Sequence, residues 1–115
     1  MKPLREAKKV PPKAARLLRQ CKRLIRQFLP DATVLLYGSL ARGTAGPESD
    51  WDILILTRKR LTAAEEDPIR DAIYPLELDH EVVLSFIFYA QEDWDSPLHR
   101  VSPFHRNVQR EGVLI

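Results

Sequence analysis

Apolar residues recur every three or four positions between Pro12 and Leu29, which is the clearest periodic pattern in the chain. The apolar positions are Ala14, Leu17, Leu18, Cys21, Leu24, Ile25 and Phe28. At ~100° per residue they fall within an arc of about 120°, and basic residues fill the rest of the helical wheel. Pro11 suits the start of a helix and Pro30 suits its end. The pattern predicts an amphipathic helix docked on the domain, with Cys21 in the core rather than acting as a reactive thiol.

Apolar runs elsewhere in the chain predict strands. Thr33–Tyr37 and Trp51–Thr57 have the character of short buried strands, and Val82–Ala90 is rich in β-branched and aromatic residues. Between the second and the third run, Thr62 and Glu65 have the spacing of a helix capping box, which predicts a helix over the residues that follow. Because helices and strands alternate along the chain, we expect an α/β (α+β) layer fold.

The remaining segments are less regular. Residues 92–103 indicate a loop with room for one helical turn, and Phe104–Glu111 indicates a last short helix, followed by Val113–Ile115 at the end of the chain. Residues 1–10 are expected to form a flexible basic tail, and residues 11–115 a single domain.

Composition narrows the class of protein. A chain of 115 residues with 44% hydrophobic residues suits a folded domain with one modest core. No apolar stretch approaches the ~18 residues that a membrane span needs, and there is no signal-peptide pattern. A single cysteine excludes an internal disulfide, so we expect a cytoplasmic protein without a membrane partner.

Charge is unevenly distributed along the chain. Residues 1–30 carry ten Lys or Arg residues and one acid, whereas the rest carries eight basic and fifteen acidic residues. A basic helix of this kind is most often a solvated face. Contact of this face with RNA, DNA or the phosphates of a nucleotide stays open as the alternative.

The segment after the first predicted strand carries the clearest candidate chemistry. Gly38 permits a tight turn and lets a phosphate group approach the backbone. Ser39 is placed to cap a short helix over Leu40–Arg42, whose free N–H groups can donate to an anion. Gly43 would end that helix at a positive φ angle.

Asp50 and Asp52 stand two positions apart at the start of the second predicted strand. Their side chains should emerge from the same face, about 6.5–7 Å apart along the backbone. Two carboxylates at this distance suit a hard cation such as Mg²⁺ or Mn²⁺, which would also cancel their repulsion. A metal held there would clamp a triphosphate against the turn at Gly38, and positioning with charge neutralisation does most of the catalytic work in nucleotidyl transfer.

The stretch YGSLARGTAGPESDWDILIL resembles the signature of the DNA polymerase beta-like nucleotidyltransferase superfamily, and especially its small minimal nucleotidyltransferase branch. The residues that fit the signature are Gly38, Ser39, Ala41, Arg42, Gly43, Ser49, Asp50 and Asp52. The resemblance implies a mixed β-sheet with helices packed on one side. It also implies Mg²⁺-dependent transfer of a nucleoside monophosphate, with ATP as the expected donor, to an acceptor hydroxyl.

The same resemblance implies roles for individual residues. The implied nucleotide-binding residues are Gly38, Ser39, Arg42 and Ser49, and the implied metal ligands are Asp50 and Asp52. Active members usually supply a third carboxylate from a later strand, but the interior of Val82–Tyr89 has Ser85 at its middle and no acid. The nearest acids are Glu77, Asp79 and Glu81. Glu81 is closest to the strand, and we take it as the third catalytic candidate.

Functions from two different classes follow from this pattern. In the first, the chain is an enzyme that transfers AMP to a partner protein, as the antitoxin of a helical HEPN-type toxin, which the resemblance implies. In the second, it is an inactive relative that masks a partner protein. The missing acid inside Val82–Tyr89 favours the second function, and the Gly-Ser and Asp-x-Asp pairs favour the first. RNA binding through the basic helix is a third, weaker alternative.

Overall fold

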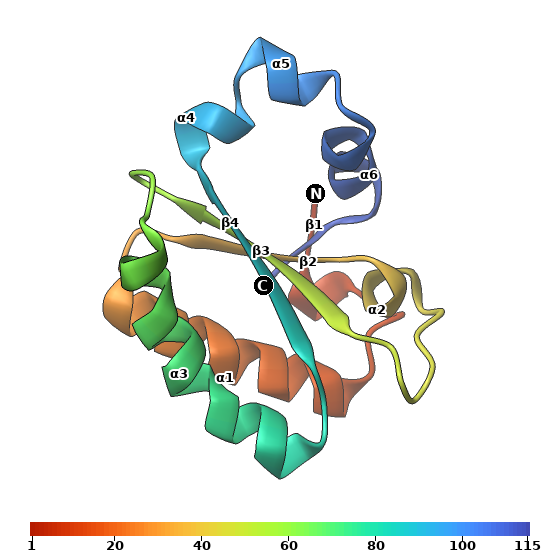
Figure 1. Cartoon of the computed structure of the whole chain (residues 1–115). Coiled ribbons are helices and arrows are strands. Elements are labelled where there is room, and N and C mark those ends of the chain that lie inside the picture. The colour runs from red at the N-terminus through yellow and green to blue at the C-terminus, as the bar shows by residue number, and fades with distance from the viewer.

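A five-stranded mixed sheet lies at the centre of the computed structural model, which describes residues 1–115 (Figure 1). Its strands, in spatial order, are β1 (Lys2–Pro3), β5 (Val113–Leu114), β2 (Thr33–Tyr37), β3 (Trp51–Thr57) and β4 (Leu84–Ala90). β3 and β4 run parallel, whereas β2 runs antiparallel to both β3 and β5. The predicted α/β fold with a mixed sheet is confirmed, since all three strands expected from the sequence lie side by side.

The amphipathic helix expected from the sequence is α1 (Pro12–Phe28), which lies on one face of the sheet (Figure 1). Most of its apolar stripe is buried, with Leu18 and Ile25 fully enclosed in the main core, whereas Phe28 at the end of the helix is exposed. Cys21 lies in this core, which confirms the prediction. Burial of its thiol, together with the charge of Glu77, raises the pKa of Cys21 to about 12.

The second long helix on this face is α3 (Ala63–His80), which packs beside α1 (Figure 1). The predicted capping box is present. The hydroxyl of Thr62 accepts from the Glu65 backbone N–H at 3.2 Å, and the Glu65 carboxylate accepts from the Thr62 backbone N–H at 3.1 Å. The helix continues through Pro68 and Pro75, where the sequence left its course open. No helix in the protein has both the length and the apolar character needed to cross a membrane.

Short helices cover the opposite face of the sheet. They are α4 (Gln91–Trp94), α5 (Pro97–Arg100) and α6 (Pro103–Glu111). A second cluster of buried residues joins them to the sheet, and it contains Leu54 from β3, Trp94 from α4 and Val108 from α6. The sequence predicted a loop with one helical turn for residues 92–103. The structure has two short helices there, α4 and α5, and the hydroxyls of Ser96 and Ser102 accept backbone N–H groups at the starts of α5 and α6.

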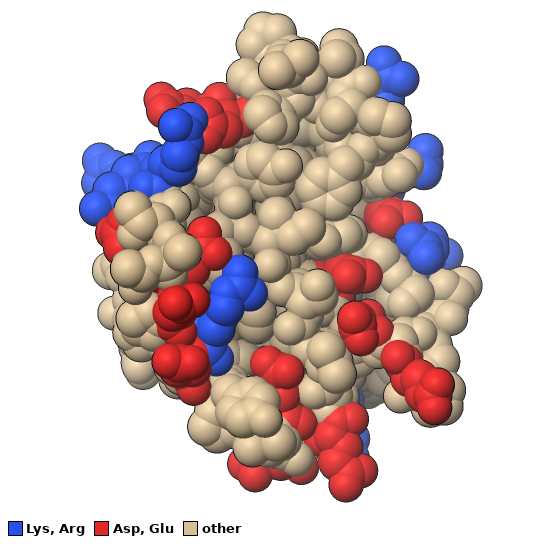
Figure 2. All heavy atoms as spheres, viewed as in Figure 1, with Lys and Arg blue, Asp and Glu red and all other residues tan.

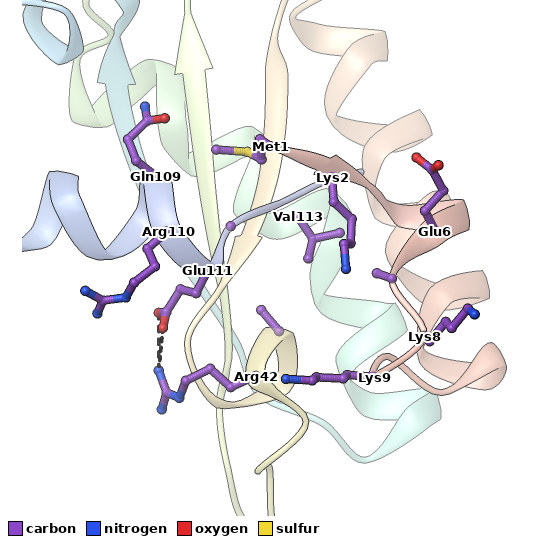
Figure 3. A pocket seen from close by; sticks show the side chains of 13 residues that line it. Met1, Lys2, Glu6, Lys8, Lys9, Arg42, Gln109, Arg110, Glu111 and Val113 are labelled. Atoms are coloured by element: carbon purple, nitrogen blue, oxygen red, sulfur yellow. Dashed lines mark hydrogen bonds and ion pairs between the residues drawn. The ribbon is translucent and has the colours of Figure 1, made fainter.

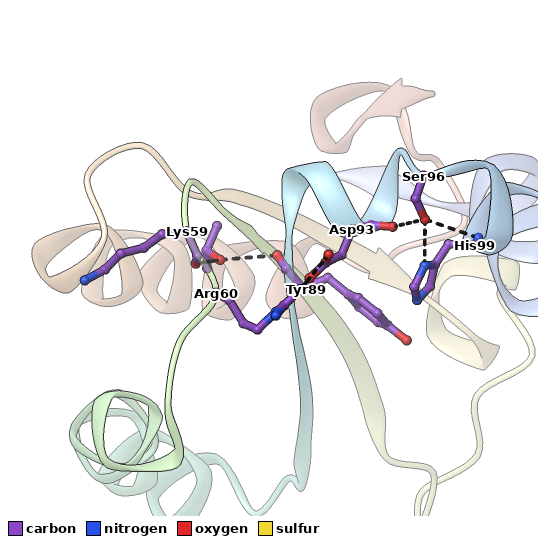
Figure 4. A network of polar contacts seen from close by, with 7 residues as sticks. Lys59, Arg60, Tyr89, Asp93, Ser96 and His99 are labelled. Carbon is purple, nitrogen blue, oxygen red and sulfur yellow. Dashed lines mark hydrogen bonds and ion pairs between the residues drawn. The ribbon is translucent and has the colours of Figure 1, made fainter.

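A polar network holds α4 at the carboxyl-terminal end of β3 and β4 (Figure 4). Arg60 donates to the Asp93 carboxylate at 2.8 Å, and the hydroxyl of Thr57 donates to the Tyr89 carbonyl at 3.3 Å. The polar groups at this end of the sheet are therefore engaged in contacts that hold α4 in place. The opposite end of β3, where Asp52 lies, is the end at which candidate chemistry was predicted.

The first ten residues differ from the expected flexible tail. β1 pairs with β5 in parallel, and a 3₁₀ turn at Leu4–Glu6 follows it. Leu4, Ala7 and Val10 are buried in the main core. These apolar residues stand three positions apart, so one side of the segment faces the core while its lysines face solvent. The high content of basic residues concealed this pattern in the sequence.

Candidate active site

The turn at the end of β2 brings Gly38 directly against Asp52. Gly38 has φ +79° and ψ −158°, a conformation that is essentially restricted to glycine. A methyl group on Gly38 would overlap the Oδ2 atom of Asp52. The absence of a side chain at Gly38 therefore makes room for Asp52, and the approach of a phosphate group to this backbone stays a prediction.

The short helix α2 (Ser39–Arg42) follows this turn. The sequence expected Ser39 to cap it, but Gly38 occupies the N-cap position and no side chain makes a capping hydrogen bond. The hydroxyl of Ser39 is therefore not committed to the helix. Gly43 ends α2 in the left-handed conformation with φ +79°, as predicted.

The two aspartates lie at the start of β3, on the side of the sheet away from the main core. Asp52 stands opposite Tyr37 of β2, and its neighbour Trp51 packs against the main core. Burial raises the pKa of the Asp52 carboxyl above its ordinary value, and the charge of Asp50 raises it further. Arg42 lowers this pKa, and Glu111 raises it. The charges of Asp50, Arg42 and Glu111 thus all act on the Asp52 carboxyl, and the joint role of the two aspartates as metal ligands stays a prediction.

Glu111, which the sequence analysis did not single out, belongs to this cluster. Its carboxylate accepts a hydrogen bond from the Gly38 backbone N–H at 3.1 Å and from Arg42 Nη1 at 3.1 and 3.2 Å. Figure 3 shows the Arg42 and Glu111 side chains meeting between α2 and α6. Because 73 residues separate Gly38 from Glu111, no local pattern could have indicated this contact.

The charges of this cluster do not balance. Arg42 supplies one positive charge against the three carboxylates of Asp50, Asp52 and Glu111, which leaves two negative charges. Figure 2 shows several acidic side chains on this face of the molecule. A divalent cation would neutralise this excess, and carboxylate oxygens are the donors that Mg²⁺ and Mn²⁺ prefer. Asp50 and Asp52 therefore supply the type of donor atom that the predicted metal prefers, although they form no three-residue metal group with Glu111.

The third carboxylate is not found inside β4, because Ser85 stands directly opposite Asp52. Glu81 lies at the C-cap of α3, exposed to solvent, in a left-handed conformation with φ +54°. No three His, Cys, Asp or Glu side chains are arranged as a group that could hold a metal. The structure thus does not bring Glu81 together with both aspartates as a ligand set, and its catalytic role stays a prediction.

Ser49 has a structural contact in the loop before β3. Its hydroxyl accepts from the Gly46 backbone N–H at 2.9 Å, which closes the turn around Pro47. The predicted role of Ser49 in nucleotide binding therefore stays a prediction. The histidines show no zinc-type grouping: His99 Nδ1 lies 2.9 Å from the Ser96 hydroxyl, and His105 stacks on Trp94 with ring centroids 4.2 Å apart.

Comparison with known families shows to which family the chain belongs. Residues 18–107 match the family model described as "Nucleotidyltransferase domain". The chain belongs to this nucleotidyltransferase family. The matched residues include the Gly38 turn and both aspartates, so the Gly-Ser and Asp-x-Asp pairs lie inside the shared domain. The chain is accordingly a nucleotidyltransferase, and its match to the family ends before Glu111.

Two curated relatives of this nucleotidyltransferase come from Methanocaldococcus jannaschii. The chain is 33% identical over 75 residues to "Putative protein adenylyltransferase MJ0141". The aligned segment covers 64% of this chain and 76% of the relative. The chain is 34% identical over 82 residues to a protein with the same description, MJ0604, over 71% of this chain and 75% of the relative. The shared segment is thus most of both proteins.

A solved structure has the same fold. A chain of "Crystal structure of the toxin-antitoxin with AMP-PNP" superposes with a TM-score of 0.60, covering 84% of this nucleotidyltransferase and 69% of that chain. The sequence identity is 18%, so this likeness supports the fold alone. It agrees with the mixed sheet described above.

A cavity of about 710 Å³ adjoins the acidic cluster (Figure 3). It lies between the amino-terminal segment, α2 and α6, and its lining includes Lys2, Lys9, Arg42 and Glu111. Neither aspartate lines it. Since Arg42 and Glu111 line the cavity and Glu111 also binds the Gly38 N–H, this pair lies between the cavity and the Gly38 turn.

Proposed function

We propose that this nucleotidyltransferase transfers AMP from ATP to a hydroxyl group of a partner protein, with Mg²⁺ or Mn²⁺ held by Asp50 and Asp52. The observation that carries the proposal is the contact between the Gly38 turn and Asp52, with the charge of Asp50 acting on the same carboxyl. In this proposal the Gly38 turn binds phosphate beside the oxygens of Asp50 and Asp52 that hold the metal, as nucleotidyl transfer requires.

The transfer breaks one bond and forms one bond. The oxygen of the acceptor hydroxyl forms a bond to the α-phosphorus of ATP, and the bond from that phosphorus to the bridging oxygen breaks. Pyrophosphate leaves, and the hydroxyl proton passes to a base or to solvent. When bound, a divalent cation supplies charge neutralisation on the phosphate oxygens. Asp50 and Asp52 are the residues of this chain that would hold it.

The turn residues have distinct tasks in this proposal. The Gly38 N–H already donates to Glu111, so it does not donate to phosphate. The hydroxyl and backbone N–H of Ser39 are then the nearest donors of the turn, because the first N–H groups of a helix have no partner within it. Arg42 adds a positive charge next to the turn, and about half of its side chain is exposed.

The donor and the acceptor are inferred from the relatives. The two archaeal relatives are described as protein adenylyltransferases, which supports ATP as donor and a protein as acceptor. The structural neighbour contains a toxin–antitoxin pair and an ATP analogue. We infer a HEPN-type toxin as the partner from the resemblance noted in the sequence, and the cytoplasm as the place of reaction.

Label transfer from ATP tests the proposal. The protein is incubated with Mg²⁺, its candidate partner and ATP labelled either at the α- or at the γ-phosphorus. We expect the partner to gain the α-label only, and Asp50→Ala and Asp52→Ala each to abolish the transfer. Asp71→Ala, which changes an exposed acid on α3, is the matched control and should transfer normally. Transfer of the γ-label would indicate phosphorylation and would overturn the proposal.

A non-catalytic binding module is the second candidate, and the observation that favours it is Ser85 opposite Asp52, where an acid would complete the site. Such a module would bind its partner tightly, transfer no label, and keep its affinity after Asp50→Ala and Asp52→Ala. The same assay, combined with a measurement of partner affinity, therefore separates the two functions.

A further inference from the structure

Glu111 lies at the junction of α6 and β5, and the sheet register brings it to the Gly38 turn. β5 pairs antiparallel with β2, with Val113 opposite Leu36. Gly38 lies two residues after Leu36, and Glu111 lies two residues before Val113. Continuation of the antiparallel register therefore brings Glu111 opposite Gly38. Gly112 permits this approach, because a methyl group there would overlap the Val108 carbonyl oxygen and press on Met1. The position of Glu111 is thus fixed by backbone geometry rather than by a flexible surface contact.

The Glu111 carboxylate contacts both ends of the turn. One oxygen accepts from the Gly38 N–H at the start, and both oxygens accept from Arg42 at the end of α2. The side chain of Glu111 is only 14% exposed, so these bonds are partly shielded from water. Hydrogen bonds to an ionised acceptor are stronger than bonds between neutral groups. They hold Gly38 in a conformation that it would otherwise leave easily.

Glu111 also determines where the charge of Arg42 lies. The Glu111 carboxylate binds both Arg42 and the Gly38 N–H, and Gly38 lies against Asp52, so the guanidinium is held next to this aspartate. An Arg42–Asp52 pair would occupy oxygens that the proposed metal needs. The ion pair with Glu111 keeps Arg42 beside the aspartates without binding them.

We propose that Glu111 is a positioning residue for nucleotide binding, which fixes the Gly38 turn and keeps Arg42 away from Asp50 and Asp52. This inference rests on the proposed function, and it concerns a residue outside the segment that matches the family. Glu111 is not proposed as a metal ligand, because its two oxygens are engaged by Gly38 and Arg42 and no three-residue metal group is formed.

Titration calorimetry with ATP and Mg²⁺ tests the inference, alongside the exchange rate of the Gly38 amide proton measured by NMR. We expect Glu111→Ala to weaken nucleotide binding about tenfold or more and to speed exchange at Gly38. Glu111→Gln keeps an acceptor for Gly38 but loses the charge, so exchange should stay slow while binding falls by a smaller factor. Glu6→Gln changes an exposed glutamate that lines the same cavity and should have no effect on either quantity.

The double variant Glu111→Ala with Arg42→Ala separates positioning from a general loss of structure. If the freed Arg42 competes with Mn²⁺ for the aspartates, Glu111→Ala should also weaken Mn²⁺ binding, and removal of Arg42 should restore part of that affinity. Normal binding by a folded Glu111→Ala variant would overturn the inference and leave the proposed function intact. Absence of nucleotide binding by the wild-type protein would overturn the proposed function, and this inference with it.

Discussion

Gly38 and Asp52 lie against each other across β2 and β3, close enough that a single methyl group on Gly38 would overlap the Asp52 carboxylate. Gly38 also has a positive φ angle, which an alanine side chain tolerates poorly. Both the turn and the acid therefore depend on the absence of a side chain at position 38.

Gly38→Ala should lower the free energy of unfolding by at least about 1–3 kcal/mol, since it adds backbone strain to the steric overlap. It should also remove nucleotide binding, because Asp52 is displaced. Urea denaturation and calorimetry measure the two effects. Gly46→Ala is the matched control: Gly46 has no positive φ, and a methyl group there meets only the Ser49 hydroxyl at 3.8 Å. Equal stability of the two variants would contradict the geometry.

Asp52→Asn should stabilise the metal-free protein at neutral pH. The pKa of Asp52 is raised in the folded state, by burial first and by Asp50 second. An acid of this kind stabilises the fold while protonated, and this contribution is lost as the pH rises from its unfolded to its folded pKa. Thermal denaturation in a chelator, compared at pH 3 and pH 7.5, should show the wild type losing more stability relative to Asp52→Asn at the higher pH. A lower melting temperature for Asp52→Asn at pH 7.5 would contradict this reading.

Binding of Mn²⁺ should strengthen as the pH rises through the folded-state pKa of Asp52. The proton and the metal compete for the same carboxylate, so protonation weakens the site. Paramagnetic relaxation of water protons follows the bound ion across the pH range. The dependence should be much reduced in Asp52→Asn. An unchanged pH profile in this variant would show that other acids hold the metal.

Cys21 should not react with a thiol reagent in the folded protein. It is fully buried, and its pKa of about 12 leaves almost no thiolate at pH 8. Labelling with a chromogenic disulfide reagent should be negligible in buffer and complete in denaturant. Rapid labelling without unfolding would contradict the placement of Cys21 in the core.

The parts of the fold that the sequence predicted well are those set by local patterns. The apolar stripe of α1 and the Thr62–Glu65 capping box are signals within a few residues, and both elements form where expected. The Gly38 turn was also recognisable, because a glycine followed by a serine directly after a predicted strand is a local signal for a tight turn. The short strand and 3₁₀ turn within residues 1–10 were missed because three apolar residues among basic ones gave a weak signal, and the pairing of β1 with β5 makes the segment part of the fold.

The part of the candidate site formed by neighbouring residues was predictable from the sequence, whereas the part contributed by the distant Glu111 was not. Asp50 and Asp52 share one strand start, so the sequence alone placed them together. Glu111 reaches the site through the register of β5 on β2, which no spacing in the sequence encodes. Glu81, by contrast, is near β4 in sequence, but α3 continues to His80 and leaves it at an exposed helix end.

The most direct test of the central claim is calorimetric titration of ATP into the protein with and without Mg²⁺. The account predicts binding that requires the metal, is lost in Asp50→Ala and Asp52→Ala, and is kept in Asp71→Ala. Binding of equal strength without a divalent cation, or binding that persists after both aspartates are removed, would contradict it.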